Sequence, residues 1–399
     1  MSSKPTNKVI PYGKQHITKK DIEAVTNALR SDFLTQGPKI AEFEAAFATY
    51  IGAKYAVALS NGTAALHLCT IALGVKEGDK VITTPITFAA SANCVRYCGG
   101  EVIFSDIDPD TFLLDIKKVR ILLETHPKGT FKGIIPVDFA GLAVNLEEFR
   151  QLADEYGLWI IEDSCHSPGG YFTDSKGQKQ HCGNGVFADL AIFSFHPVKH
   201  IASGEGGMIT TNDEILYKKL LMLRTHGITR EQDLFKLNAT DISQGGWYME
   251  MQELGYNYRL TDIQAALALS QLERADTGLD KRKKIARRYF DAFKSIIKIK
   301  AQPWEITEGH AYHLYVIRVE NRLELYNYLR ENNIFPQVHY IPTHLMPYYQ
   351  GLGWKKGDMP LAEKYYAQCL SLPMYPTLSV KEQNRVIKLI INFIKTTNG

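Results

Sequence analysis

One lysine in this sequence follows a buried strand at a position where its amine could act as a nucleophile. An apolar strand predicted over residues 190–195 turns polar at Ser194, and Lys199 lies just past its end, before a glycine-rich turn and a second strand. Partial burial at such a position lowers the pKa of a lysine and leaves more of its amine free to attack a carbonyl. That reactivity suits Schiff-base chemistry. A solvent-exposed loop lysine is the common alternative. The residues that follow the other predicted strands are therefore needed to distinguish a nucleophile from an ordinary surface lysine.

The elements that would position this lysine follow an α/β pattern. Short apolar segments predict seven strands, at residues 55–59, 80–84, 101–106, 133–138, 159–162, 190–195 and 207–211. Helical spacing of apolar residues predicts helices between most of them, for example at 64–73, 89–97, 115–124 and 146–156. This alternation is typical of a mostly parallel sheet covered on both faces. The last two strands are joined by too few residues for a crossover helix, so we expect them to be antiparallel or distant in the sheet.

The segments on either side of this pattern are mainly helical. Helices are expected at 18–30, with Thr18 as the N-terminal cap, and at 39–51. After residue 260 the pattern predicts a long helical stretch over 261–293, a strand at 311–319, and helices at 321–332 and 381–396. We therefore expect a large domain over residues 1–260 and a smaller α+β domain over residues 261–399.

Residue types that suit a phosphate-bearing aromatic cofactor follow several of the predicted strands, where ligands of parallel sheets bind. After the first strand, Gly62 and Thr63 begin a turn into a helix, which suits a phosphate group, although a plain helix cap gives the same pattern. After the second strand comes Phe88, which can stack on a ring or fill the core. After the fifth comes Asp163, whose carboxylate can pair with a protonated pyridine nitrogen. Together with Lys199, these residues describe a site for pyridoxal phosphate (PLP).

Four motifs, in this order, resemble those of the DegT/DnrJ/EryC1/StrS family of sugar aminotransferases. They are Ser-Asn-Gly-Thr-Ala-Ala-Leu at 60–66, Glu-Asp-Ser-Cys-His at 162–166, Phe-Ser-Phe-His-Pro-Val-Lys at 193–199 with the Gly-Glu-Gly-Gly that follows it, and the segment 255–266. The resemblance covers about residues 10–380. It implies the α/β fold of the PLP-dependent transferases (aspartate aminotransferase, type I), with a mostly parallel seven-stranded sheet and a smaller C-terminal α+β domain.

The resemblance also implies roles for individual residues. Lys199 resembles the Schiff-base lysine, and Asp163 resembles the partner of the pyridine nitrogen. The other implied cofactor contacts are ring stacking by Phe88, a contact on the other side of the ring or near its phenolic oxygen by His166, and phosphate binding by Gly62, Thr63 and Ser194. Asn257 resembles an asparagine that reaches the phosphate of the neighbouring subunit. The resemblance therefore implies a homodimer with two composite active sites.

Three shorter stretches, at 31–38, 224–230 and 337–349, resemble the pseudaminic-acid branch of this family. That branch implies transfer of an amino group from L-glutamate to C4 of a UDP-linked 4-keto-6-deoxy-N-acetyl-L-hexosamine, giving UDP-4-amino-4,6-dideoxy-N-acetyl-β-L-altrosamine. Acceptors of the bacillosamine or 4-amino-arabinose type are the alternatives. Arg259 and His339 are candidates for contacts with the donor carboxylate or the sugar, and a surface or interdomain ion pair is the competing explanation for each. Arg230 is the candidate for a contact with the uridine or the diphosphate.

Two other functions fit parts of the pattern. Sugar dehydrases resemble these enzymes but carry a histidine where the aminotransferases carry the lysine, and His200 follows Lys199 directly. Three residues separate Lys199 from Phe195 and four separate it from Gly204, and both spacings put the lysine in the catalytic position. A histidine cannot form the imine that anchors PLP. A sugar-sensing protein without turnover is the second alternative, and the presence of Lys199 argues against it.

Composition excludes several broad classes of function. The chain has 399 residues, a formal net charge of +3, and 45% hydrophobic against 22% charged residues, so nothing calls for a nucleic-acid or membrane-surface partner. No apolar run is long enough to span a membrane, and the first residues lack the apolar core of a signal peptide, so we expect a cytoplasmic protein. The six cysteines contain no Cys-x-x-Cys pair, and we expect reduced thiols and no metal site.

Overall fold

The computed structural model describes residues 8–237, 245–301 and 308–396. At its centre is a seven-stranded sheet in the order β2-β10-β9-β6-β5-β3-β4. The strands are β2 (Tyr55–Leu59), β3 (Lys80–Thr83), β4 (Glu101–Phe104), β5 (Phe131–Ile135), β6 (Trp159–Asp163), β9 (Leu190–Ser194) and β10 (Gly207–Thr211). β10 is antiparallel to both of its neighbours, and the other adjacent pairs are parallel. The seven predicted strands are confirmed, and the last two are antiparallel neighbours.

Helices cover both faces of the sheet because its strands are apolar on both sides. In β2, Ala58 packs in one core with Phe47, whereas Val57 packs in a second core with Leu66. The first core is built with α2 (Pro38–Ile51) and α8 (Asp262–Leu272). The second core is built with α3 (Gly62–Ala72), α4 (Ala90–Tyr97), α5 (Ile116–Glu124), α6 (Leu146–Tyr156) and α7 (Glu214–Leu223).

The N-terminal helix α1 (Lys19–Leu29) packs along α8. Thr18 caps it, as predicted, and forms a capping box with Asp21. The helical stretch predicted over 261–293 is two helices, α8 and α9 (Ala275–Phe293), rather than one. Arg274 leaves the helical conformation between them, and its guanidinium donates to the buried carboxylate of Asp21 and to the carbonyl of His16. This tertiary ion pair explains the break, which the apolar spacing did not reveal.

A separate hydrophobic core holds the C-terminal part of the chain. Its three-stranded antiparallel sheet contains β13 (Lys300–Ala301), β14 (Tyr315–Arg318) and β16 (Cys369–Leu372). α9, α10 (Arg322–Glu331) and α13 (Val380–Thr396) pack in this core, whereas α11 (Pro347–Gln350) and α12 (Pro360–Gln368) pack in the core of the seven-stranded sheet. The N-terminal strand β1 (Ile10–Pro11) pairs with β15 (Ile334–Phe335) and joins this core. α8, which begins at Asp262, packs with α2 rather than in this core. The predicted division into two domains at residue 260 stays a prediction.

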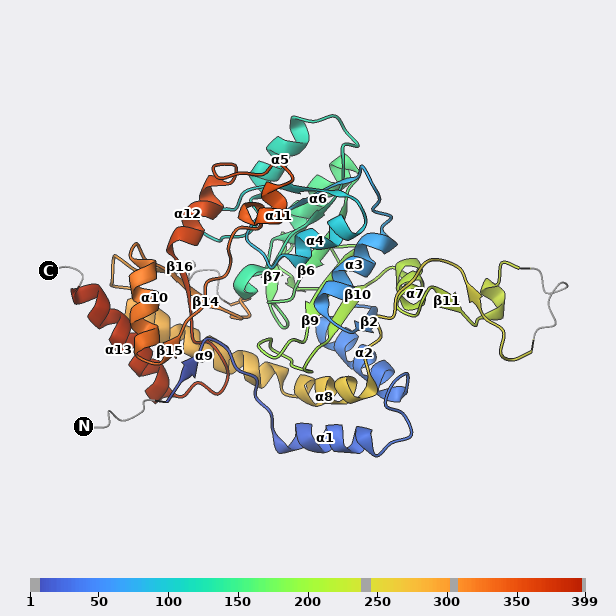
Figure 1. The fold of residues 1–399 in the computed structure, drawn as a ribbon, viewed down its shortest axis with the longest axis horizontal. Coiled ribbons are helices and arrows are strands. Elements are labelled where there is room, and N and C mark those ends of the chain that lie inside the picture. Colours follow the sequence, from blue (N-terminus) through green and yellow to red (C-terminus); the bar gives the residue numbers. More distant parts are fainter. Residues whose placement is uncertain (1–7, 238–244, 302–307, 397–399) are drawn as a thin grey trace.

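An arm projects from the body of the molecule at the end opposite α13 (Figure 1). It carries the antiparallel strands β11 (Ile228–Thr229) and β12 (Glu250–Met251). A smaller hairpin, β7 (Tyr171–Thr173) with β8 (Lys179–His181), follows β6 in the sequence. Among the residues described, no helix combines the length and the apolar character needed to cross a membrane.

Candidate active site

Lys199 lies five residues beyond the end of β9, in the turn that leads to β10. Its N–H donates to the carbonyl of His196 at 2.8 Å. Burial lowers the pKa of Lys199 below its usual 10.5, the acidic groups of Cys165 and Asp163 oppose that shift, and the Arg282 cation adds to it. The amine is therefore free for a larger fraction of the time than that of an exposed lysine, which fits a nucleophile.

A turn with unpaired backbone N–H groups lies at the start of α3. Asn61 caps this helix, and its side-chain oxygen accepts from the N–H of Ala64 at 2.8 Å. Within the described part of the chain, the N–H groups of Gly62 and Thr63 have no hydrogen-bond acceptor. Gly62 lies so close to Ser194 that a Cβ on Gly62 would come within 3.1 Å of the serine Cβ. Free N–H groups at a helix N-terminus, with a hydroxyl beside them, suit a phosphate group.

The carboxylate of Asp163 is held in one orientation at the end of β6, where the residue is 5% exposed. The hydroxyl of Ser91 donates to Oδ2 at 2.6 Å, and the N–H of Cys165 donates to Oδ1 at 3.1 Å. Because Ser91 gives its proton to Asp163, Thr87 must be the donor in the 2.7 Å contact between the Thr87 and Ser91 hydroxyls. A fixed, buried carboxylate is the group that keeps a pyridine nitrogen protonated.

His166 is buried three residues after Asp163, and its hydrogen bonds define its tautomer. The N–H of Ala140 donates to Nδ1 at 3.2 Å, so the proton of the neutral ring is on Nε2. Burial is the main reason that the pKa of His166 lies well below 6.5, and the Lys199 cation contributes. Nε2 lies 3.2 Å from the hydroxyl oxygen of Tyr340 and donates to it. The hydroxyl proton of Tyr340 is therefore available for a further acceptor.

The segment 310–314 is tied to this site by several contacts. The ring of His313 lies over that of His166, with centroids 4.3 Å apart. The Nε2 of His200 donates to the carbonyl of Ala311 at 2.8 Å. Arg282, which is buried on α9, donates to the carbonyl of His313 at 3.2 Å, and burial lowers its pKa to about 10. The predicted strand at 311–319 begins only at Tyr315 because its first residues make these contacts instead, including a bond from Leu314 to the carbonyl of Ala140.

The exposure of Phe88 decides between the two roles considered from the sequence, stacking on a ring and filling the core. It exposes 63% of its surface, and its ring lies 6.3 Å from that of Tyr340, so it does not fill the core. An exposed aromatic ring is available for stacking on a ligand. The unpaired N–H groups of Gly62 and Thr63, the fixed carboxylate of Asp163 and the amine with a lowered pKa on Lys199 fit the phosphate, the ring nitrogen and the aldehyde of PLP.

The remaining predicted residues lie at the edges of this site or outside it. Asn257 is exposed on a segment paired with Thr225, and Arg230 is exposed on the arm. Arg259 is half-buried beside the end of β2. His339 is buried, its Nδ1 bonds the hydroxyl of Ser371 at 2.9 Å, and burial lowers its pKa to about 3. Only Nε2 of His339 is therefore free for a substrate, and all four assignments stay predictions.

All six cysteines are free thiols in the structure. The described residues contain one cluster of three potential metal ligands, formed by Asp138, Glu162 and Cys182. Cys182 belongs to this cluster, whereas Cys94 and Cys98, which lie four residues apart in the sequence, do not.

Ser91, Tyr340, His313 and Arg282 were not identified from the sequence. Each comes from a different element, and each reaches the site through a tertiary contact. One signal was available, because Tyr340 belongs to the stretch 337–349, which resembles the pseudaminic-acid branch of the family.

Comparison with known proteins matches this geometry to one family. The DegT/DnrJ/EryC1/StrS aminotransferase family matches residues 15–391. The spore coat polysaccharide biosynthesis protein SpsC of Bacillus subtilis is 38% identical, with 98% of each chain covered. A Campylobacter jejuni protein named UDP-4-amino-4,6-dideoxy-N-acetyl-beta-L-altrosamine transaminase is 37% identical, covering 97% of this chain and 98% of its own.

Solved structures show the same similarity. PseC of Helicobacter pylori, described as an aminotransferase of pseudaminic acid biosynthesis, superposes with a TM-score of 0.86 at 28% identity, covering 98% of this chain and 100% of its own. The PLP form of the putative sugar aminotransferase Spr1654 of Streptococcus pneumoniae superposes with a TM-score of 0.84 at 29% identity, covering 96% and 97% of the two chains. The fold is therefore that of the PLP-dependent aminotransferases, as the sequence motifs implied.

Proposed function

This chain belongs to the DegT/DnrJ/EryC1/StrS aminotransferase family and is a PLP-dependent nucleotide-sugar aminotransferase, and on that premise we propose its substrates. The amino donor is L-glutamate. The acceptor is a UDP-linked 4-keto-6-deoxy-N-acetyl-L-hexosamine, and the product is UDP-4-amino-4,6-dideoxy-N-acetyl-β-L-altrosamine. The observation that supports this choice is the similarity, over nearly the whole chain, to the Campylobacter transaminase named for that product.

The residues of this chain divide the work of amino transfer between them. Bound PLP supplies a carbon that bonds to amines and a ring that accepts an electron pair. Nζ of Lys199 takes the proton from Cα of L-glutamate and, in the second half of the cycle, gives a proton to C4 of the sugar. Asp163 holds the positive charge on the ring nitrogen, and the N–H groups of Gly62 and Thr63 hold the phosphate. Phe88 and His166 orient the ring.

A second acceptor class deserves the same test because SpsC, whose name refers to a spore coat polysaccharide, is as similar as the Campylobacter enzyme. A bacillosamine-type acceptor differs from the proposed acceptor in ring stereochemistry, whereas a 4-amino-arabinose-type acceptor is a pentose. A pocket discriminates between such sugars by which polar groups it leaves unpaired. The candidates for that discrimination are Arg259, His339 and Arg230.

The experiment that tests the proposal offers both epimers to the same enzyme. The PLP-loaded protein is mixed with L-glutamate and either UDP-4-keto-6-deoxy-L-AltNAc or its C5 epimer, and product mass and 2-oxoglutarate are followed. We expect amination of the L-sugar with kcat/KM at least about 10-fold higher than for the epimer. The reverse preference would move the enzyme to the bacillosamine branch, and no amination of either sugar would overturn the acceptor assignment.

We further propose a homodimer with composite active sites. The arm exposes four large apolar side chains to solvent, and such exposed apolar surface is typical of an interface with another protein. They are Leu237, Trp247, Met251 and Leu254. The arm also extends well clear of the rest of its own chain (Figure 1), so a second copy is the natural partner for it. Asn257, at the base of the arm, is exposed and would reach the phosphate bound by the partner subunit.

Complementation between two inactive variants tests this arrangement. Asn257→Asp puts a negative charge beside the phosphate and should lower activity at least about 10-fold. Co-expressed with Lys199→Ala, it should regain about one quarter of the wild-type activity, because half of randomly formed dimers are mixed and each has one intact site. Asp163→Asn is the matched control, since Asp163 and Lys199 belong to the same protomer's site and the mixture should stay inactive. Equal failure of both mixtures would place Asn257 in its own subunit's site.

A further inference from the structure

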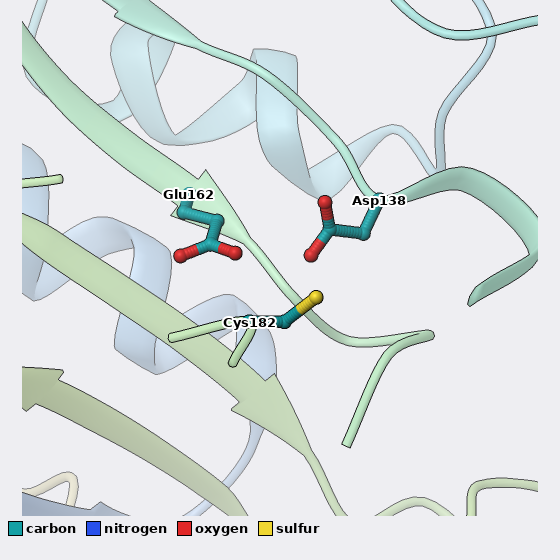
Figure 2. Close-up of side chains that lie close together, drawn as sticks. All are labelled: Asp138, Glu162 and Cys182. Carbon is teal, nitrogen blue, oxygen red and sulfur yellow. The ribbon is translucent and has the colours of Figure 1, made fainter. Parts of the chain in front are cut away.

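Two carboxyl groups are buried together, one on the strand that carries Asp163 and one on the segment after the neighbouring strand β5. Asp138, just after β5, is 0% exposed, and Glu162, in β6, is 2% exposed. Figure 2 shows the two carboxyl groups facing each other, with the thiol of Cys182 pointing toward them. Among the described residues, no basic side chain forms an ion pair with either carboxyl. One oxygen of each carboxyl and the sulfur of Cys182 lie within 4.8 Å of one another. Two negative charges this close together, without a cation, are not stable in a protein interior.

The hydrogen-bond donors around the pair distinguish the two carboxyls. Asp138 accepts three: from the N–H of Val144 at 2.9 Å, from the hydroxyl of Ser167 at 2.6 Å and from the hydroxyl of Ser164 at 3.1 Å. Glu162 accepts from the N–H of Gly183 at 2.8 Å, and it shares the Ser164 hydroxyl, whose proton points to Asp138, as a neighbour. Donors stabilise the charged form of a carboxyl, so the negative charge belongs on Asp138 and the proton on Glu162.

The electrostatics agree with this division. Burial raises the pKa of Glu162 well above 4.5, and the charge of Asp138 raises it further. Burial also raises the pKa of Asp138, but its hydrogen bonds to Ser167 and Val144 oppose that rise. Burial raises the pKa of the Cys182 thiol well above 9.0, so this group stays protonated beside the pair. On the side of the site, burial and the charge of Asp163 raise the pKa of the Cys165 thiol, and the charge of Asp138 adds to that rise.

We propose that Asp138 is a positioning residue, a buried monoanion that shares the proton of Glu162 and fixes the loop carrying Asp163 and His166. Both serines that donate to Asp138 lie on that loop, one immediately after Asp163 and the other immediately after His166. The backbone reinforces the attachment, since the N–H of Asp138 donates to the carbonyl of Asp163 at 3.1 Å. The proposal rests on the proposed function only in assigning cofactor contacts to Asp163 and His166.

The alternative of a metal ion at this cluster fits the contacts less well. A cation would need ionised carboxyls with free oxygen lone pairs, whereas Asp138 already accepts three hydrogen bonds. Elemental analysis of the purified holoenzyme separates the two: we expect no stoichiometric metal, and one bound metal per chain would overturn the shared proton.

Two isosteric substitutions test the assignment because they should behave differently. Glu162→Gln keeps a donor toward Asp138 and an acceptor for Gly183, so kcat and the dissociation constant of PLP should stay within about twofold of wild type. Asp138→Asn replaces the acceptor of three donors, so PLP should bind about 10-fold more weakly and kcat should fall about 10- to 100-fold, as for other residues that orient a site's ligating groups. The opposite order would mean that the charge lies on Glu162, and equal tolerance of both would remove the positioning role.

Infrared spectroscopy can detect the proton on Glu162 without any measurement of catalysis. The C=O stretch of a buried, protonated carboxyl should be present in the wild-type holoenzyme, shift in D₂O, and disappear in Glu162→Gln. Its persistence in that variant would contradict the assignment of the proton to Glu162. Because this band does not depend on turnover, a failure of the proposed sugar specificity would leave the infrared result intact. Loss of the band in Glu162→Gln supports the protonation of Glu162, and amination of the L-sugar by the wild-type enzyme separately supports the proposed function.

Discussion

Lys199→Ala is expected to abolish amino transfer, lowering kcat at least about 10³-fold, because the variant loses the nucleophile and the proton carrier in a single change. Covalent attachment of PLP should be lost as well. Reduction with borohydride followed by peptide mass analysis would detect the cofactor on the peptide that contains residue 199 in the wild type and on no peptide of the variant.

Two further variants make this result specific. Lys199→Arg keeps a cation in the same turn, but a guanidinium stays protonated and cannot attack a carbonyl, so it should be as inactive as Lys199→Ala. Lys176→Ala changes an exposed lysine in the turn between β7 and β8 and should retain full activity. Substantial turnover by Lys199→Ala would contradict the assignment and reopen the dehydrase alternative, in which His200 takes the lysine's place.

The fold was predictable from sequence because it depends on local patterns. Each of the seven strands is a short apolar run bounded by turn residues. The short connection between Phe195 and Gly207 left two arrangements open, antiparallel or distant in the sheet, and the structure shows antiparallel neighbours. The break between α8 and α9 was missed because its cause is an ion pair between Arg274 and Asp21, more than 250 positions apart in the chain. Apolar periodicity carries no information about such a contact.

The site was predictable only in part, for a related reason. Gly62, Asp163 and Lys199 each lie at or just beyond the end of a strand, so the rule that ligands bind at the carboxyl ends of parallel strands brought them together. Tyr340 and Ser91 orient the groups around them but come from the segment between β15 and α11 and from the first turn of α4. Their roles depend on which donor meets which acceptor, and that is decided by tertiary packing alone.

Asp163→Asn is expected to have the second-largest effect, lowering the rate of the half-reaction with L-glutamate about 10²- to 10³-fold while PLP still binds. The amide has nearly the same shape as the carboxylate, so the hydroxyl of Ser91 and the N–H of Cys165 retain a possible partner. It carries no charge, however, and cannot keep the ring nitrogen protonated. The ring would then accept the electron pair from Cα of the donor less well.

A graded series separates charge from orientation at this carboxylate. Ser91→Ala removes the 2.6 Å hydrogen bond to Oδ2 but leaves the charge in place, so its rate should fall only about 10-fold. Stopped-flow absorbance during the reaction with L-glutamate measures both variants directly, without the sugar. If Asp163→Asn were no slower than Ser91→Ala, the carboxylate would act through its geometry, and the charge on the ring nitrogen would have to come from another group. A rate for Asp163→Asn at least about 10-fold below that of Ser91→Ala would instead identify the buried negative charge as the feature that makes this site an electron sink.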